Sequence, residues 1–330
     1  MCARAREFGL PLRLVGRNRD ALERLAESGD EARLADARDG PALREAFDGA
    51  SAVVSLAGPF LHVGLAPVEA AVEAGVHYLD SSGEQAFARA VYERFGEAAA
   101  RRGVVVLTSF GFDFVVGDLA ARLTADALEP LDEVAVAYAV SRVATSAGTR
   151  RTLGHVLAQE VVAFERGALV RSSFGATTRR FRFPFGEASA VEWGGAEPLT
   201  VPRHTNVRAV RSYVRAPRVA AKAGPLLRAA APVLHVAGGL GPAGPSERRR
   251  ARARFAVVAE AHGAAGGRRV TLTGRDVYGL TALALVRGAE VLRAGDARGP
   301  GTLAPAEAFD PRELVGRLGP LLRVESVEEL

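Results

Sequence analysis

The 330-residue sequence lacks several features that would restrict its chemistry or its location. Cys2 is the only cysteine, which excludes an intrachain disulfide and a cysteine-rich metal site. Lys222 is the only lysine and lies far from the loops considered below, which argues against lysine-dependent acid–base or Schiff-base chemistry. No apolar run reaches the roughly 20 residues of a membrane span, and no signal peptide is recognisable. We expect a cytoplasmic protein without a membrane span or a bound metal.

Positive charge comes almost wholly from arginine, and the formal net charge is +5. Arginines and acidic residues are interspersed along most of the chain, so we expect no nucleic-acid partner. One run is the main exception, and a solvated start of an element explains it better than a binding patch. This run consists of Arg248, Arg249, Arg250, Arg252 and Arg254. A hydrophobic content of 48% is ordinary for a globular protein, and the length of 330 residues allows about two domains.

Residues 51–84 have the pattern of a βαβ unit, around which the rest of the chain is organised. An apolar run over residues 52–57 ends at Gly58-Pro59, a helical segment ends at Gly75, and a second apolar run leads into Asp80. Parallel strands need a crossover of this kind. Ligands of such sheets bind beyond the carboxyl ends of the strands. The loops after these two strands are therefore the expected site of any chemistry.

The flanking segments continue the alternation of strands and helices. We expect strands over residues 10–15, 32–35 and 104–107, and helices over residues 3–8, 20–26, 41–47, 87–102 and 117–128. This alternation predicts an α/β, Rossmann-like, doubly wound parallel sheet. Its usual first strand and glycine-rich turn do not open the chain. Because that strand is central, its absence would leave a gap of about 10 Å unless the sheet rearranges, and we expect an N-terminally truncated chain.

From Asp132 onward the pattern changes to that of a mixed α+β region. Residues 133–140 alternate like a half-buried strand, and we expect helices over residues 150–164, 216–237 and 280–293. Residues 254–261 and 268–273 flank a glycine-rich turn, which predicts a hairpin. Asp310 followed by Pro311 predicts the start of a last short helix.

Several residues at the strand ends could bind a dinucleotide. Arg17 stands where an acidic residue would bind the ribose of NAD, and an arginine there can pair with the 2′-phosphate of NADP. The alternative is a solvated arginine in an arginine-rich protein. The turn at Gly58 would let the backbone approach the nicotinamide, or it is simply the end of a strand. The candidate cofactor-binding residues are Gly16, Arg17, Asn18, Asp36, Ala57, Gly58, Pro59 and Phe60.

Four ionisable side chains at or near the same strand ends are the candidate catalytic residues. A tyrosine or a carboxylate could protonate a developing anion during hydride transfer. A carboxylate here could instead cap the following helix, which is the favoured role for Asp113. The four candidates are Tyr78, Asp80, Glu84 and Asp113. His77 precedes the loop and is expected to be structural.

Together these segments resemble the saccharopine dehydrogenase-like (saccharopine reductase) family, which includes bacterial trans-acting enoyl reductases. The resemblance covers most of the chain. The matching stretches are residues 14–18, 57–60, 74–80 with Gly83-Glu84, 111–113, 146–149, 276–282 and 303–309.

The resemblance implies three parts of the chain. These are a dinucleotide-binding domain over residues 1–130, an α+β substrate or dimerisation domain over 131–275, and a segment over 276–330 that returns to the first domain. It also implies NADP-dependent (less favoured, NAD-dependent) reduction of a C=N or C=C bond in a small-molecule or acyl substrate. Fold analogy alone suggests a homodimer through the second domain. The alternative is a cofactor-dead relative that binds a protein partner, because the family's glycine-rich turn does not open this chain.

Overall fold

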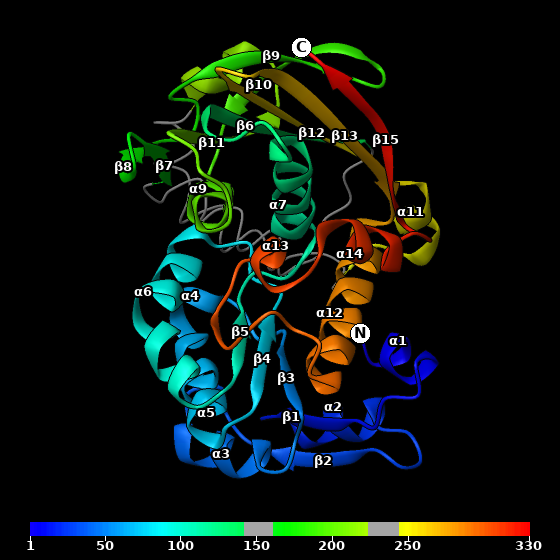
Figure 1. The fold of residues 1–330 in the computed structure, drawn as a ribbon. Helices are drawn as coiled ribbons and strands as arrows, with labels where there is room; N and C mark the ends of the chain where they lie inside the picture. The colour runs from blue at the N-terminus through cyan, green and yellow to red at the C-terminus, as the bar shows by residue number, and fades with distance from the viewer. Residues whose placement is uncertain (142–160, 224–243) are drawn as a thin grey trace.

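The computed structural model describes residues 1–141, 161–223 and 244–330, and Figure 1 shows them as two stacked parts. The lower part holds short parallel strands with helices around them, and the upper part is a large sheet curved around one helix, α7 (Phe112–Ala125). This confirms the expected combination of an α/β Rossmann-like domain with a second domain built on a mixed sheet.

A four-stranded parallel sheet forms the centre of the first domain, in the order β14-β5-β4-β3. Its strands are β3 (Ala52–Ser55), β4 (His77–Asp80), β5 (Val105–Leu107) and β14 (Gly301–Thr302). The helices of this region are α3 (Gly40–Phe47), α4 (Phe60–Val63), α5 (Leu65–Ala74), α6 (Gln85–Arg101) and α12 (Val277–Ala294). Tyr78 and Val106 pack into the cluster formed with α5 and α6, whereas Leu79 and Val105 pack into the cluster that contains α12. Successive side chains of a strand point to opposite faces, so helices cover both faces of this sheet.

The first two strands form a separate sheet. β1 (Arg13–Gly16) pairs in parallel with β2 (Glu31–Leu34), and neither pairs with any other described strand. Helix α2 (Arg19–Leu25) packs against both strands, and α1 (Cys2–Glu7) packs against α12. The Arg13 guanidinium donates to the carbonyls of Ala46 at 3.1 Å and Asp48 at 2.5 Å, at the end of α3. β1 is therefore fastened to the domain through α3, and β1 and β3 lie in different sheets.

The large sheet of the second domain has the order β15-β13-β12-β6-β11-β10-β9, with the hairpin β7-β8 attached to β11. Its strands are β6 (Leu131–Ser141), β7 (Val161–Glu165), β8 (Ala168–Ser172), β9 (Thr178–Phe183), β10 (Gly186–Glu192), β11 (Ala209–Arg215), β12 (Arg254–Gly263), β13 (Gly266–Arg275) and β15 (Leu322–Glu329). The hairpin predicted around the glycine-rich turn is β12-β13 and is confirmed.

Helix α7 fills the concave face of the large sheet. Val257 and Leu272 of the sheet share one buried cluster with Val115 and Leu119 of α7, and this cluster continues to α12. On the opposite face, β9 turns its phenylalanines onto the small side chains of β6 and β12. The two domains therefore share one core, which fixes the loops between them.

The C-terminal segment is divided between the two domains. α12 packs against β3 and β4, and β14 pairs with β5 of the first domain. β15, in contrast, pairs antiparallel with β13 in the large sheet. The remaining short helices are α9 (Glu197–Thr200), η1 (Val201–Arg203), η2 (Arg218–Ala223), α11 (Glu247–Arg252), α13 (Pro305–Ala308) and α14 (Pro311–Arg317). Asp310 accepts hydrogen bonds from two N–H groups of α14, which confirms the predicted start of that helix.

Three expectations fall wholly or partly outside the described residues. The helix predicted over residues 150–164 lies outside them up to residue 160, and residues 161–164 belong to strand β7, not to a helix. The helix predicted over 216–237 is described only as the 3₁₀ helix η2 and lies outside from residue 224. The 146–149 stretch also lies outside. The run of arginines at 248–252 falls on α11, which has no buried residue, as a solvated element requires.

Candidate active site

The carboxyl ends of β3, β4 and β5 meet where the first domain faces the second (Figure 1). Asp80 closes β4 and holds two of the loops there. Its Oδ1 accepts hydrogen bonds from the N–H groups of Ser82 and Ser109, both at 2.8 Å. Ser109 has a φ of 59°, a left-handed conformation that costs free energy in a non-glycine residue. The Asp80 contact thus offsets that cost and joins the loops after β4 and β5.

Burial raises the pKa of the Asp80 carboxyl to about 6, and the two N–H donors counteract part of that rise. The Tyr78 and Thr108 hydroxyls also lie close enough to lower this pKa, although neither forms a well-aligned hydrogen bond. Tyr78 is 0% exposed, and burial raises its pKa well above 10. Both predicted residues therefore lie inside the domain, beneath the surface of the site.

Glu84 holds the turn that follows β3. Its two carboxylate oxygens accept hydrogen bonds from the N–H groups of Phe60 and Leu61, each at 2.9 Å. These are the first two N–H groups of α4, which no intrahelical carbonyl can satisfy. The residues before them, Ala57 and Gly58, are exposed at the loop surface. Glu84 therefore fixes a turn whose backbone is open to a ligand.

Asp113 is the exposed member of the predicted catalytic set. It lies in the first turn of α7 beside Gly83, and the surrounding protein raises its pKa to about 6 by desolvation. The capping role favoured for it from sequence is wrong, because its side chain accepts no hydrogen bond from the helix start. Thr281 of α12 accepts the N–H of Phe112 at 3.1 Å instead. The exposed Asp113 side chain therefore lies beside the loop that follows β4.

The residues predicted to bind the adenosine part of a dinucleotide lie at the ends of β1 and β2. Asn18 accepts the Ala21 N–H and caps α2. Arg17 is 74% exposed, and its nearest carboxylate oxygen belongs to Asp36, 3.8 Å away. The side chain and the N–H of Arg38 bind Asp36 and lower its pKa, so the carboxylate stays charged. An available guanidinium and a fixed carboxylate therefore stand side by side.

Sequence reasoning missed a cluster of buried polar residues behind α7. The Tyr138 hydroxyl donates to Glu197 Oε1, and the Ser212 hydroxyl donates to Oε2 at 2.5 Å. Burial raises the pKa of Glu197 to about 7. Gly117 makes room for this contact, because a Cβ there would lie 2.0 Å from both oxygens of the Tyr138–Glu197 pair. No local pattern signals this cluster, since its members come from four separate elements.

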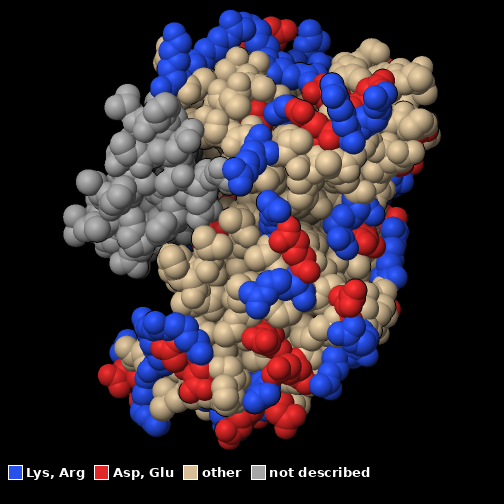
Figure 2. Space-filling model, turned by 90° about the vertical axis from the view of Figure 1, so that its left-hand side faces the viewer, with Lys and Arg blue, Asp and Glu red and all other residues tan. Residues whose placement is uncertain are grey.

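His77 accepts the Val105 N–H through Nδ1 at 3.0 Å, which supports the structural role expected for it. Across the described ranges, no group of three or more His, Cys, Asp or Glu side chains is arranged to hold a metal ion. Over those same ranges, no helix has the length and apolarity needed to cross a bilayer. Figure 2 shows basic and acidic side chains interspersed on one face, as their order in the sequence predicts.

An open parallel sheet with helices on both faces, and loops gathered at the carboxyl ends of its strands, is the architecture of a dinucleotide-binding domain. Residues 1–107 match the family model described as the saccharopine dehydrogenase NADP binding domain. This match over the first third of the chain confirms the resemblance drawn from sequence.

Curated relatives align with only part of the chain. A lipid droplet localized protein of Caenorhabditis elegans is 35% identical over 86 residues, which are 26% of this chain and 20% of that protein. A saccharopine dehydrogenase-like oxidoreductase of Bos taurus is 30% identical over 122 residues, covering 33% of this chain and 28% of its own. A trans-acting enoyl reductase of Mycobacterium ulcerans is 33% identical over 86 residues, 26% of this chain and 21% of its own. The aligned part thus spans less than a third of each of these relatives.

The whole chain resembles a solved structure, apo saccharopine dehydrogenase (L-Glu forming) from Saccharomyces cerevisiae. The match covers 99% of this chain and 96% of that one, with a TM-score of 0.62 and 14% sequence identity. At this identity the match shows a shared fold, and it extends over both domains.

Proposed function

We propose that this chain is an NADP-dependent oxidoreductase that acts where the carboxyl ends of β3, β4 and β5 face the second domain. The observation that carries the proposal is the turn at Gly58, held by both oxygens of Glu84 with its backbone exposed. The NADP-binding family match over residues 1–107 supports it. NADPH, when bound, supplies a hydride to the substrate.

The residues at the ends of β1 and β2 fit the adenosine end of this cofactor. Among the described residues Arg17 forms one long ion pair, with Asp36 at 3.8 Å, and its side chain is 74% exposed. An exposed guanidinium can form two parallel hydrogen bonds to a phosphate. Asp36, kept charged by Arg38, can accept a hydrogen bond from a ribose hydroxyl. We therefore favour NADP over NAD.

The proton that balances hydride transfer requires an accessible acid. Asp113 is exposed and has a pKa of about 6, so part of it is protonated near neutral pH. Tyr78 and Asp80 are fully buried, and we assign Asp80 and Glu84 to positioning the loops. We propose Asp113 as the proton donor. Tyr78 remains a candidate only as an indirect donor that acts through Asp80.

Two further parts of the proposal concern the bond that is reduced and the partners of the protein. The names of the relatives support reduction of a C=N or a C=C bond in a small-molecule or acyl substrate. We propose that the second domain supplies the substrate side of the site. A homodimer through the large sheet rests on fold analogy.

Calorimetric titration of NADPH and NADH into the 330-residue protein tests the cofactor assignment. We expect NADPH to bind more tightly, and Arg17→Ala to weaken NADPH at least about tenfold while changing NADH less than about twofold. Arg24→Ala removes an exposed arginine of α2 and serves as the matched control. Equal losses for both nucleotides in the Arg17 variant would contradict the 2′-phosphate assignment.

The same titration separates the enzyme from its alternative. A folded wild-type protein that binds neither nucleotide would overturn the proposal. That result would favour the second hypothesis, a cofactor-dead relative that binds a protein partner.

A further inference from the structure

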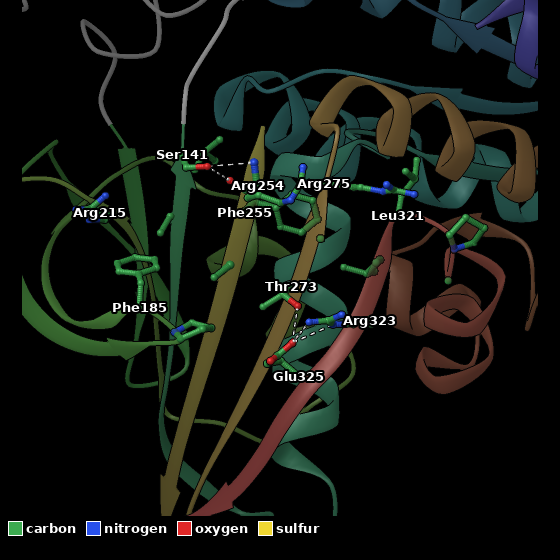
Figure 3. Close-up of a pocket in the computed structure, with 18 residues that line it drawn as sticks. Ser141, Phe185, Arg215, Arg254, Phe255, Thr273, Arg275, Leu321, Arg323 and Glu325 are labelled. Carbon is green, nitrogen blue, oxygen red and sulfur yellow. Dashed lines mark hydrogen bonds and ion pairs between the residues drawn. The ribbon is translucent and has the colours of Figure 1, made fainter. Parts of the chain in front are cut away.

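A cavity of about 870 Å³ lies on the large sheet, on the face away from α7 (Figure 3). Ala139 and Ala256 on this face have small side chains, so they leave a hollow between the larger side chains around them. Phe185 and Leu321 stand on opposite sides of it. The volume falls within the range of about 300–1,000 Å³ that small-molecule sites occupy.

Gly274 lets the loop before β15 close one end of this cavity. A Cβ at this position would lie 2.1 Å from the Leu321 carbonyl oxygen and 2.3 Å from the Phe255 ring. Only glycine permits so close an approach. The wall formed by residues 319–322 is therefore fixed by packing against β13.

Four arginines surround the cavity, and strand register brings two of them together. Arg254 of β12 stands directly opposite Arg275 of β13, and Arg323 of β15 stands opposite Thr273. Arg215 lines the far side (Figure 3). Like charges directly opposite each other on neighbouring strands destabilise a sheet. An anion between Arg254 and Arg275 would remove that repulsion.

Among the described residues, a carboxylate neutralises only one of these arginines. Arg323 pairs with Glu325 at 2.7 Å, the sole acidic side chain among the lining residues. Within the described part of the chain, Arg215, Arg254 and Arg275 have no carboxylate at salt-bridge distance. The Arg254 guanidinium donates only to backbone carbonyls, at 2.7 and 3.2 Å. Other arginines of the same sheet each bind two carboxylates, namely Arg179, Arg211 and Arg269.

An exposed aromatic ring lies beside these charges. Phe185 is 57% exposed, and its ring stacks on Phe183 with centroids 5.2 Å apart and planes 4° apart. The Arg215 guanidinium lies 4.9 Å from the Phe185 ring centroid. A flat apolar group could therefore pack against this ring while its charged end meets the arginines.

We propose that this cavity binds a phosphate monoester with an aromatic body. Its phosphate would sit between Arg254 and Arg275, since paired guanidinium groups match the oxygens of a dianion by charge-assisted hydrogen bonds. Its aromatic body would pack against Phe185. The site is separate from the candidate active site and does not depend on the proposed oxidoreductase activity.

Calorimetry with phenyl phosphate as the probe tests this site. We expect the wild-type protein to bind phenyl phosphate more tightly than inorganic phosphate, and phenol to give no measurable binding. The double variant Arg254→Gln/Arg275→Gln should bind phenyl phosphate at least about tenfold more weakly. Arg182→Gln removes an exposed arginine of β9 outside the cavity and should bind normally.

Four results would overturn parts or all of the proposal. No binding by the wild type, or equal binding by the double variant, would show that this cavity is not the binding site. Equal affinity for inorganic phosphate and phenyl phosphate would show that an aromatic body adds nothing to binding. Loss of phenyl phosphate binding in Arg17→Ala would place the probe at the cofactor site instead.

Thermal unfolding keeps the test independent of a folding defect. Without an anion, the double variant should melt at or above the wild-type temperature, because the cross-strand repulsion is gone. Phenyl phosphate should raise the melting temperature of the wild type and of Arg182→Gln, and leave that of the double variant unchanged. An equal rise in all three proteins would contradict the assignment.

Discussion

The side-chain amide of Gln85 pairs with the backbone of Val162 as a neighbouring strand would. The Val162 N–H donates to Gln85 Oε1 at 2.7 Å, and Gln85 Nε2 donates to the Val162 carbonyl at 3.0 Å. The same nitrogen also donates to the Gly195 carbonyl at 2.6 Å. Gln85 is the first residue of α6, directly after Glu84, so one buried side chain joins the loop of the candidate site to the second domain.

Replacing Gln85 with leucine should therefore destabilise the protein strongly. Three buried backbone groups would lose the partner they now have, and we expect the free energy of unfolding to fall by about 2–4 kcal/mol. Urea unfolding followed by circular dichroism measures this. Glu97→Gln, at a 92% exposed side chain of the same helix, should change stability by less than about 0.5 kcal/mol. Similar values for the two variants would show that Gln85 does not hold the domains together.

Glu84→Gln tests the turn at the candidate cofactor site. A glutamine offers one acceptor oxygen, so it can satisfy only one of the two N–H groups of Phe60 and Leu61 that Glu84 now binds. We expect NADPH affinity to fall about 5- to 20-fold. Glu69→Gln, at an exposed position of α5, is the control for calorimetry. A folded Glu84 variant with wild-type NADPH affinity would separate this turn from cofactor binding.

Glu197 should make stability fall as pH rises. Its folded-state pKa of about 7 is above its usual value of 4.5, so the folded protein holds this proton more tightly than the unfolded chain. The resulting stabilisation is fully present below pH 4.5 and is lost as pH rises through 7. Asp80 and Asp113, with pKa values raised to about 6, contribute in the same direction.

Glu197→Gln isolates the contribution of this residue, because glutamine has no proton to lose. Relative to the wild type, the variant should gain about 1–3 kcal/mol of stability between pH 5 and pH 8. Urea unfolding at both pH values measures the difference. Glu187→Gln, at an exposed carboxylate of β10, should show little change with pH. A pH-independent difference for Glu197→Gln would mean that this carboxyl does not titrate with a raised pKa.

The elements predicted from sequence are those that local pattern governs. The strand, turn, helix and strand of residues 51–84 follow from apolar periodicity and from Gly75, whose left-handed φ of 72° ends α5. The β12-β13 hairpin follows from its glycine-rich turn, and the start of α14 follows from the capping Asp310. The placement of the candidate site at the carboxyl ends of the strands follows from the right-handed crossover.

The contacts made inside the site were not predictable in this way. Glu84 reads from sequence as a catalytic acid, yet its carboxylate binds N–H groups 23 and 24 residues earlier in the chain. Asp113 reads as a helix cap, yet the N–H of Phe112 at the start of that helix is bound by Thr281, 169 residues after Phe112. Each outcome depends on which distant element packs beside the loop.

The sequence by itself determined the class of the first domain, the positions of its strands and helices, and the edge of the sheet at which the candidate residues gather. Spacing and turn residues encode these features locally. Only the tertiary structure decided that Tyr78 is buried, that Gln85 joins the two domains, and that the arginines of four strands surround one cavity. The reason is that strand register and packing, rather than spacing along the chain, bring those side chains together.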